Sequence, residues 1–369
     1  MKYVVVDVVV RRGSGGILSV LQDVYQYARK DINNEYIFIV GTSGILQNSK
    51  NIRIIVREDL QKSHVRRLWF DFWKGKHYLQ KFAPDVLISL QNTAILRVAF
   101  PQMVYLHQPI SFVRSYSFSP FKKSERKLFF YQRIAGLAIK ANLFLFKQGG
   151  ITVQTEWMKS EISKYSKAKV FVTKPSISLT DFKNVKGHQN SSHFFFPSTA
   201  MIYKNHAALV SAYELLPIEL QEQMDLILTI TREEFYQLYG QKVTSSHIKF
   251  LGRISRRKVI QLLNESVLVF PSKVESLGLP LLEAMKLGRP IVASNISPVK
   301  EVTNGYSSVQ YFDPDNIHDI SIALNKAFSM KSPIENLKRD HVDGWKSFFS
   351  NVALLSKLDL TKQTQSQDS

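Results

Sequence analysis

Short runs of β-branched and aromatic residues alternate with longer amphipathic segments along most of the chain. Residues 3–10 predict a buried strand, and apolar positions recur at helical spacing directly after it, at Ile17, Val20, Leu21 and Val24. The same pattern predicts strands over residues 36–40, 52–56, 85–90, 101–106 and 150–154, and helices over 65–82 and 121–146. This alternation of strands and helices is typical of a parallel sheet that is covered on both faces.

A polar segment, residues 174–192, interrupts the alternation, which then restarts. Strands are expected over residues 194–197, 225–230, 248–251, 268–270 and 290–293, and helices over 206–216, 256–265, 281–287, 314–327 and 345–358. We therefore expect a first α/β domain over residues 1–173, a linker over 174–192, a second α/β domain over 193–343, and a closing helix with a polar tail over 344–369. In doubly wound sheets, ligands bind in the loops that follow the strands.

The composition is that of a folded protein with several kinds of site excluded. Of 369 residues, 44% are hydrophobic and 21% are charged, which is enough apolar side chain to build a core. Because there is no cysteine, disulfides, thiolate zinc sites and cysteine nucleophiles are excluded. No apolar run reaches the length of a membrane-spanning helix, and the apolar N-terminus, interrupted by Asp7 and followed by arginines, does not have the order of a signal peptide.

The positive charge is concentrated in one half of the chain. Residues 1–190 carry 30 basic and 12 acidic side chains, whereas residues 191–369 carry 19 and 18. Nearly all of the net charge of +19 therefore lies in the first half. Such asymmetry indicates an anionic partner for that half: nucleic acid, anionic lipid or a phosphorylated substrate.

The stretch 271–294, PSKVESLGLPLLEAMKLGRPIVAS, contains the most specific chemistry. It follows an apolar strand, and a helix is expected to begin near Leu281, where unpaired N–H groups suit a phosphate. Glu275 lies in the loop and Glu283 in the first helical turn, so both carboxylates can face one pocket. A carboxylate can accept hydrogen bonds from two hydroxyls, as the vicinal diol of a sugar or ribose requires.

This stretch resembles the E-x7-E signature of the family-4 retaining glycosyltransferases, with the Gly278-Leu279-Pro280 and Glu283-Ala284-Met285 contexts intact. The resemblance implies the GT-B fold: two Rossmann-like doubly wound domains that face a central cleft, with a C-terminal helix returning to the N-terminal domain. It also implies that Glu283 holds the ribose hydroxyls of a nucleotide-sugar and that Glu275 holds the donor sugar near the reacting carbon. The loop residues Ser276, Leu277, Gly278 and Leu279 would face the sugar and the diphosphate. No metal or other cofactor is expected.

Three further segments resemble parts of the same family. Gly15 and Gly16 match its N-terminal glycine loop, although a plain tight turn explains them equally well, and His107 matches a histidine that lines the donor sugar pocket. Lys204 would pair with the donor diphosphate, and Ile254 would lie against the nucleobase.

Two positions depart from this pattern or imitate another one. Many members have an arginine where this chain has Thr199; Arg253, Arg256 or backbone N–H groups are candidates to replace it. The sequence Asp313-Pro314-Asp315 is a literal D-x-D metal motif, but Asp-Pro-Asp-Asn before a helix is favourable turn and capping chemistry. We therefore expect no metal there.

Basic and aromatic residues are interleaved over residues 111–147. A basic amphipathic helix is typical of a membrane surface, and a core helix with a solvated basic face is the equally weighted alternative. The charge of the first half favours an anionic membrane or a lipid-diphosphate acceptor. The candidate contacts are Lys122, Lys123, Arg126, Lys127 and Arg133.

The sequence thus predicts a hexosyltransferase-type retaining glycosyltransferase that uses a nucleotide-sugar. Its acceptor would be an oligosaccharide, lipid-linked, in surface polysaccharide synthesis, and the enzyme would sit in the cytoplasm at the inner face of the membrane. An inactive sugar-binding protein of the same fold is the first alternative. A nucleic-acid-binding protein is the second, and it is disfavoured because no zinc-finger or RNP-type pattern is present, so no nucleic-acid partner is expected.

Overall fold

The computed structural model describes residues 1–13, 16–175, 182, 191–332 and 344–367. The chain divides into two compact units, each formed from separate segments. The first comprises Met1–Phe112, Tyr131–Ser176 and Val342–Ser369, and the second comprises Val113–Phe130 and Ile177–His341. The predicted linker, residues 174–192, lies mostly outside the described residues. The segment Val113–Phe130, expected in the first domain, groups with the second unit because its side chains pack there.

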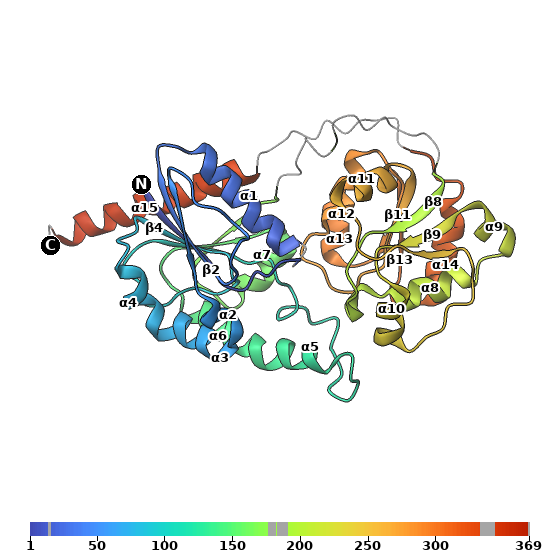
Figure 1. The fold of residues 1–369 in the computed structure, drawn as a ribbon, viewed down its shortest axis with the longest axis horizontal. Coiled ribbons are helices and arrows are strands. Elements are labelled where there is room, and N and C mark those ends of the chain that lie inside the picture. The colour runs from blue at the N-terminus through green and yellow to red at the C-terminus, as the bar shows by residue number, and fades with distance from the viewer. Residues whose placement is uncertain (14–15, 176–181, 183–190, 333–343, 368–369) are drawn as a thin grey trace. The chain divides into compact units, whose positions relative to one another are not determined.

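The first unit contains a parallel seven-stranded sheet in the order β3-β2-β1-β4-β5-β6-β7 (Figure 1). Its strands are β1 (Lys2–Asp7), β2 (Glu35–Val40), β3 (Ile52–Val56), β4 (Val86–Ser89), β5 (Gln102–Tyr105), β6 (Gly150–Val153) and β7 (Lys169–Val172). Its helices are α1 (Gly16–Lys30), α2 (Glu58–Lys62), α3 (His64–Trp69), α4 (Gly75–Gln80), α6 (Gly136–Leu145), α7 (Glu156–Ser163) and α15 (Gly344–Gln367), with π-helical turns η1 (Phe70–Lys74) and η2 (Tyr131–Ala135).

Strand β1 shows why its sequence is apolar at successive positions. Tyr3 and Val5 pack into the cluster that contains residues of α1 and α15, whereas Val4 and Val6 pack into a second cluster on the opposite face. Successive side chains of a strand point to opposite faces, so a parallel strand covered on both sides is apolar throughout. The run of valines therefore follows from the two helical layers.

The second unit contains a parallel six-stranded sheet in the order β10-β9-β8-β11-β12-β13. Its strands are β8 (His193–Phe196), β9 (Asp225–Leu228), β10 (Ile248–Phe250), β11 (Ser266–Phe270), β12 (Ile291–Ser294) and β13 (Val309–Phe312). Its helices are α5 (Arg126–Phe130), η4 (Ile202–Lys204), α8 (His206–Glu214), α9 (Ile218–Gln223), α10 (Arg232–Tyr239), α11 (Arg256–Asn264), α12 (Leu279–Lys286), α13 (Ser297–Thr303) and α14 (Ile317–Ala327). The strand order reverses between β8 and β11, and ligands bind at this switch point in doubly wound folds.

The closing helix α15 packs on the first unit. Phe348 and Val352 are fully buried in its core, and Figure 1 shows α15 beside α1. Trp345 Nε1 donates to Asp23 Oδ2 at 3.2 Å. At Gly344, a Cβ would lie 1.8 Å from the carbonyl oxygen of Lys174, so only glycine permits this approach of the two backbones. The predicted return of a C-terminal helix to the N-terminal domain is confirmed.

Two predicted helices each contain a π-helical turn. Residues 65–82 form α3, η1 and α4 in succession, and the chain expected to be helical over 121–146 becomes so only at Arg126, with the π turn η2 before α6. At Gly75 a Cβ would meet Ile95 Cγ2 at 2.5 Å, so tertiary packing places a glycine inside the helical run. The expected helix thus runs over residues 126–145 with a π-helical turn inside it, and residues 121–125 precede it as bends and turns.

Candidate functional site

The loops after β8 and β11 meet at the switch point of the second sheet. These two strands are neighbours in the sheet. The backbone N–H of Lys273, in the second loop, donates to the carbonyl oxygen of Tyr203, in the first, at 2.9 Å. The two loops that hold most of the predicted donor-binding residues are therefore joined directly.

The loop after β8 is held in place by side chains on both sides. Ser198 N donates to Thr229 Oγ1 at 2.8 Å, and Thr229 Oγ1 donates to Ser198 O at 2.9 Å. Asn205 has a left-handed backbone (φ 63°), and its Nδ2 donates to Pro314 O at 2.8 Å. Asparagine tolerates this conformation better than most residues do. Lys204 is thereby held at the end of η4, immediately before α8.

His206 begins α8 and is fully buried. Its Nε2 lies 2.8 Å from Ser198 Oγ. Burial, with a smaller effect of the Lys204 charge, lowers the pKa of His206 to about 3. The ring is therefore neutral at physiological pH, and its contact with Ser198 supports the loop.

Lys204 and Glu275 form an ion pair across the two loops, between Lys204 Nζ and Glu275 Oε1. The side chains are only 17% and 10% exposed. Charge-assisted hydrogen bonds of this kind are stronger than neutral ones. The structure thus brings together the two side chains for which the sequence predicts contacts with the diphosphate and the sugar.

Glu283 lies in α12 and is 1% exposed. Its Oε1 is 2.7 Å from Nη2 of Arg256, the first residue of α11, whose side chain is 47% exposed. The sequence names Arg256 only as one of several replacements for the arginine missing at Thr199. The structure places Arg256 at a predicted site carboxylate, whereas Thr199 is exposed.

The turn into α12 requires its glycine. Gly278 is the N-cap residue with φ 81°, a conformation that favours glycine, and a Cβ there would lie 2.9 Å from the Phe270 ring. Leu277 is buried, and Ser276 and Leu279 are partly exposed. Three predicted loop residues thus flank a helix N-terminus whose first N–H groups have no intrahelical acceptor.

The predicted nucleobase turn follows β10. Leu251 N donates to Leu228 O at 2.9 Å and Gly252 N to Ile230 O at 3.1 Å, so the turn is bonded to the chain that follows β9. Ile254 is partly buried against the core of the second unit. Its predicted contact with a base stays a prediction.

His107 belongs to the first unit and follows β5. Its backbone N–H donates to Asn92 Oδ1 at 2.8 Å, and Asn92 itself has a left-handed backbone (φ 67°). Burial lowers the pKa of His107 to about 4, so the ring is neutral near pH 7. Its Nδ1 is buried and has no hydrogen-bond partner among the residues that the structure describes. A neutral imidazole nitrogen is a suitable partner for a substrate hydroxyl.

The glycine loop of the first unit is described in part. Gly15 lies outside the described residues. Gly16 begins α1, and a Cβ built there would have no atom within 4 Å, so packing inside the chain does not require this glycine.

Sequence reasoning did not select two buried aspartates of the first unit. Asp71 accepts hydrogen bonds from Gln91 Nε2 at 2.7 Å and Thr93 Oγ1 at 2.8 Å, and burial raises its pKa to about 7. Asp7, at the end of β1, is fully buried, and burial raises its pKa well above the usual value. An acidic residue inside an apolar strand is the signal that could have identified Asp7.

The basic residues predicted at a membrane or acceptor surface are divided between the units. Lys122, Lys123, Arg126 and Lys127 lie in the second unit and Arg133 in the first. Lys122 Nζ lies 3.4 Å from the buried carboxylate of Glu125, whose Oε2 accepts from Ser119 N at 2.7 Å. A membrane or acceptor role of these residues stays a prediction.

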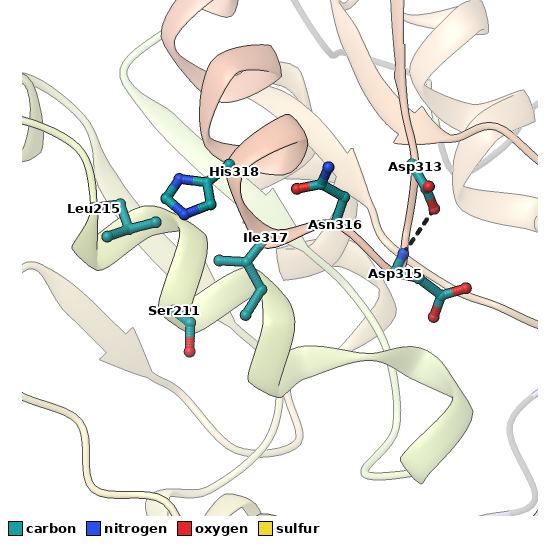
Figure 2. Close-up of a pocket in the computed structure, with 7 residues that line it drawn as sticks. All are labelled: Ser211, Leu215, Asp313, Asp315, Asn316, Ile317 and His318. Carbon is teal, nitrogen blue, oxygen red and sulfur yellow. Dashed lines mark hydrogen bonds between the residues drawn. The ribbon is translucent and has the colours of Figure 1, made fainter.

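The D-x-D sequence lies at the rim of a shallow cavity of about 590 Å3 between α8 and the start of α14 (Figure 2). Asp315 N donates to Asp313 Oδ1 at 2.9 Å, and Asp313 N donates to Asp319 Oδ2 at 2.6 Å. Asn316 caps α14 by accepting from Asp319 N at 3.2 Å. These contacts are those of a turn and a helix cap, and the Asp315 carboxylate pairs with Lys273.

Two kinds of site are absent from the described part of the chain. It contains no group of three or more histidine, aspartate or glutamate side chains placed to hold a metal ion. None of its helices combines the length and the hydropathy of a membrane-spanning segment.

The family model of the glycosyl transferases of group 1 matches residues 180–341, nearly the whole of the main segment of the second unit. The chain carries a group 1 glycosyltransferase domain. This is the domain that contains the Lys204–Glu275 and Arg256–Glu283 ion pairs. The predicted resemblance to glycosyltransferases is thereby confirmed for this segment of the chain.

Two mannosyltransferases of Escherichia coli are similar to this chain in sequence. The serotype-specific mannosyltransferase WbdA is 33% identical over 184 residues, which are 47% of this chain and 22% of that protein. The O-antigen chain mannosyltransferase B is 34% identical over 123 residues, which are 32% of each chain. The similarity thus spans between about a fifth and a third of the length of these relatives.

The solved structures extend the similarity of fold to the whole chain. Sucrose-phosphate synthase from Thermosynechococcus elongatus has a TM-score of 0.65 at 14% identity and covers 100% of this chain and 98% of its own. HepE from Anabaena, solved with UDP and glucose, has a TM-score of 0.62 at 14% identity over 99% and 100% of the two chains. WaaG, a glycosyltransferase involved in lipopolysaccharide biosynthesis, has a TM-score of 0.63 at 12% identity over 97% and 98%. The predicted GT-B fold of two Rossmann-like units is confirmed.

Proposed function

We propose that the protein is a retaining glycosyltransferase that moves a hexosyl group from a nucleotide-sugar to a hydroxyl of an oligosaccharide acceptor. The observation that carries this proposal is the meeting of Lys204 and Glu275 at the switch point of the second sheet. A cation for a diphosphate and a carboxylate for sugar hydroxyls lie together at the place where this fold binds its ligands.

Donor binding would exchange the partners of this ion pair. The diphosphate carries negative charge toward Lys204, and the sugar hydroxyls donate to the Glu275 carboxylate. Each charged group then keeps a partner when water is displaced, which avoids the cost of a buried charge left alone. As the sugar–phosphate bond breaks, Lys204 and the N-terminus of α12 would stabilise the charge that develops on the leaving diphosphate.

Arg256 would replace, in part, the arginine that many members of the family have at the position of Thr199. Its guanidinium is half-exposed while one nitrogen holds Glu283, so it can contact a donor phosphate without a large movement. Glu283 would accept hydrogen bonds from the ribose hydroxyls. We infer that no metal is needed, because the cations of Lys204 and Arg256 are already present.

The biological setting follows from the relatives. A serotype-specific mannosyltransferase and an O-antigen chain mannosyltransferase are similar to part of this chain, so mannose is the first sugar to test and a surface polysaccharide the first product. An acceptor carried on a lipid at the inner face of the membrane would place the enzyme in the cytoplasm beside an anionic surface. The excess of basic residues in the first half of the chain supports this setting.

A panel of nucleotides tests the donor. UDP, GDP, ADP, CMP and dTDP, each with and without the attached sugar, are added in thermal unfolding experiments. A ligand at about 100 times its Kd stabilises the folded state by about 2.7 kcal/mol, which is readily measured. We expect one nucleoside diphosphate to respond. Absence of any response, also with vesicles present, would favour an inactive protein of this fold.

Two variants separate the predicted roles. Glu275→Ala should abolish transfer with nucleotide binding largely retained, whereas Glu283→Ala should weaken nucleotide binding itself. Glu219→Ala, in the exposed part of α9, is the matched control and should behave as wild type. Normal transfer by both site variants would refute the site. The anomeric configuration of the product, read by NMR, tests retention, and transfer in excess EDTA tests independence of metals.

A further inference from the structure

The first unit contains a cavity of about 550 Å3 that is separate from the donor-binding loops. It lies over the chain between β3 and β4, where α2, α3, η1 and α4 follow one another. We call it the basic pocket and define it by Arg57, Arg66, Trp69, Lys74, His77 and Lys81. Its volume is in the range of small-molecule sites.

The charges that line the basic pocket are unbalanced. Arg57 is neutralised by Asp59, with Nε and Nη2 each 2.8 Å from a carboxylate oxygen. Arg66, Lys74 and Lys81 are exposed. Among the described residues, no hydrogen bond or ion pair is formed by the side chains of Arg66 and Lys81. The pocket therefore presents several cations to a ligand and is complementary to an anion.

Aromatic rings give the basic pocket a second chemical character. Arg57 lies 4.6 Å from the centroid of the Tyr78 ring, which makes a fixed wall. The π-helical turn η1 places Lys74, five residues after Trp69, over the Trp69 ring at 4.2 Å. Trp69 is nevertheless 50% exposed. A free inorganic anion has no apolar part that could contact an exposed tryptophan ring. An anion attached to an apolar chain can bury part of that chain against the ring.

The apolar surface continues along the same helical run. Val65, Trp69 and Trp73 are spaced by four residues, about one turn each, and are 76%, 50% and 51% exposed. Tryptophan is favoured at membrane–water interfaces because its ring is apolar and its N–H is polar. A row of exposed apolar side chains beside cations that have no carboxylate partner among the described residues is complementary to a lipid surface. The cations suit the phosphate headgroups, and the apolar side chains suit the upper part of the acyl chains.

We propose that the basic pocket binds the phosphate group of a membrane lipid, with Val65, Trp69 and Trp73 inserted at the level of the headgroups. This site differs from the residues 122–133 that the sequence selected. It places the first unit on the membrane through the chain between β3 and β4. It goes beyond the proposed donor chemistry and is tested without any nucleotide-sugar, so its failure and that of the transferase proposal are distinguishable.

The test measures binding of the full chain to vesicles by co-sedimentation. Vesicles of phosphatidylcholine alone are compared with an equal mixture of phosphatidylcholine and phosphatidylglycerol. Wild type should bind the mixture and not the neutral vesicles. Each basic residue near an anionic surface strengthens binding about fivefold, so Arg66→Glu with Lys81→Glu should weaken binding about thirtyfold or more. The control, Lys50→Glu with Lys167→Glu, makes the same change in net charge at exposed positions of the first unit and should stay within about twofold.

Fluorescence gives a second reading that does not depend on charge-reversed variants. Of the four tryptophans, Trp69 and Trp73 are half-exposed and Trp345 is buried. Anionic vesicles should shift the emission of wild type to the blue, and Trp69→Phe should lose much of that shift. Trp157, the fourth tryptophan, is partly buried against the core of the first unit, and Trp157→Phe should keep the shift.

Four results would overturn the proposal. The first two are equal weakening in the two charge-reversed variants, because general electrostatics would then explain binding, and a blue shift that survives Trp69→Phe. The other two are full displacement of vesicles by inorganic phosphate but not by sodium chloride of equal ionic strength, because the pocket would then take free phosphate, and tighter binding of a single-stranded oligonucleotide in competition with the vesicles, because the rings and cations would then hold nucleic acid.

Discussion

The ion pair between Lys204 and Glu275 can be tested without knowledge of the donor. Lys204→Met keeps most of the length of the side chain and removes its charge, which leaves the Glu275 carboxylate, 10% exposed, without its cation. A hydrogen bond to a charged group contributes about 1.5–3 kcal/mol. Removal of one partner of a fully buried pair costs about 3–5 kcal/mol. Because both side chains keep some contact with water, we expect a loss of about 2 kcal/mol of unfolding free energy.

Calorimetric unfolding measures this loss. A change of 1 kcal/mol shifts the Tm of a domain of this size by about 2–4 °C, so Lys204→Met should lower the Tm of the second unit by about 4–8 °C. Lys273→Met is the matched control. Lys273 lies in the neighbouring loop and is also shielded, at 19% exposure, but its partner Asp315 is 70% exposed. Such a pair contributes less than about 1 kcal/mol, and the expected shift is correspondingly small.

The double variant Lys204→Met with Glu275→Gln decides whether the two charges are coupled. With neither charge present, no carboxylate is left alone, and most of the lost stability should return. If the two single changes simply add in the double variant, or if Lys204→Met unfolds like Lys273→Met, the ion pair is not the stabilising contact and the reasoning fails. The nucleotide that responds in the binding panel should stabilise Lys204→Met less than it stabilises wild type.

Three further predictions concern buried or strained positions. Gly278→Ala introduces a Cβ at φ 81° and 2.9 Å from the Phe270 ring. We expect the free energy of unfolding to fall by about 1–3 kcal/mol and nucleotide binding, measured by thermal unfolding, to weaken. Unchanged binding would show that this turn is not part of the site. Phe348→Ala removes a fully buried ring beside Tyr105 and should lower the free energy of unfolding, measured in urea, by about 3–5 kcal/mol. An unchanged unfolding midpoint would show that α15 does not belong to the core of the first unit. Burial lowers the pKa of His206 to about 3, so the unfolded chain takes up a proton that the folded chain does not, and stability falls as the pH drops through about 6.5 toward 3. This residue alone should cost about 2 kcal/mol between pH 7 and pH 5, and His206→Gln should remove that part of the slope in urea titrations; an identical slope would contradict the assignment.

The fold could be predicted because its signals are local. Valine-rich strands, helical spacing and the strand–loop–helix around Gly278 each lie within a few residues. The edge strands β7 and β13 were missed for the same reason, whereas the edge strands β3 and β10 were predicted. β7 and β13 have only four residues each, and the sequences KVFV and VQYF mix polar and apolar positions.

The π-helical turns inside the helices could not be predicted from local pattern. Gly75 is excluded from bearing a side chain by Ile95, twenty residues away, and nothing in the neighbouring sequence reports that contact. The grouping of Val113–Phe130 with the second unit likewise depends on packing between distant residues: the rings of Phe118 and Tyr203 lie edge to face, with centroids 6.4 Å apart.

The candidate site was predicted by residue type and not by pairing. The resemblance to a family identifies Lys204, Glu275 and Glu283 separately, each by its own motif. Lys204 and Glu275 are 71 residues apart in the sequence, and this spacing does not indicate that they are in contact. The choice of Arg256 as the partner of Glu283 required the structure, because three replacements for the arginine missing at Thr199 were equally open.

The pairing of charges also explains why the excess of positive charge belongs to the first half. In the loops around the predicted donor site, the cations of Lys204, Arg256 and Lys273 each face a carboxylate before any ligand arrives. A donor diphosphate can be bound there by exchange of partners, and no surplus of basic residues is needed. We infer that the surplus of residues 1–190 serves something other than the donor. An anionic surface is the partner that a surplus spread over many exposed side chains fits best, since each adds a small share of the attraction and its pull weakens within about a Debye length.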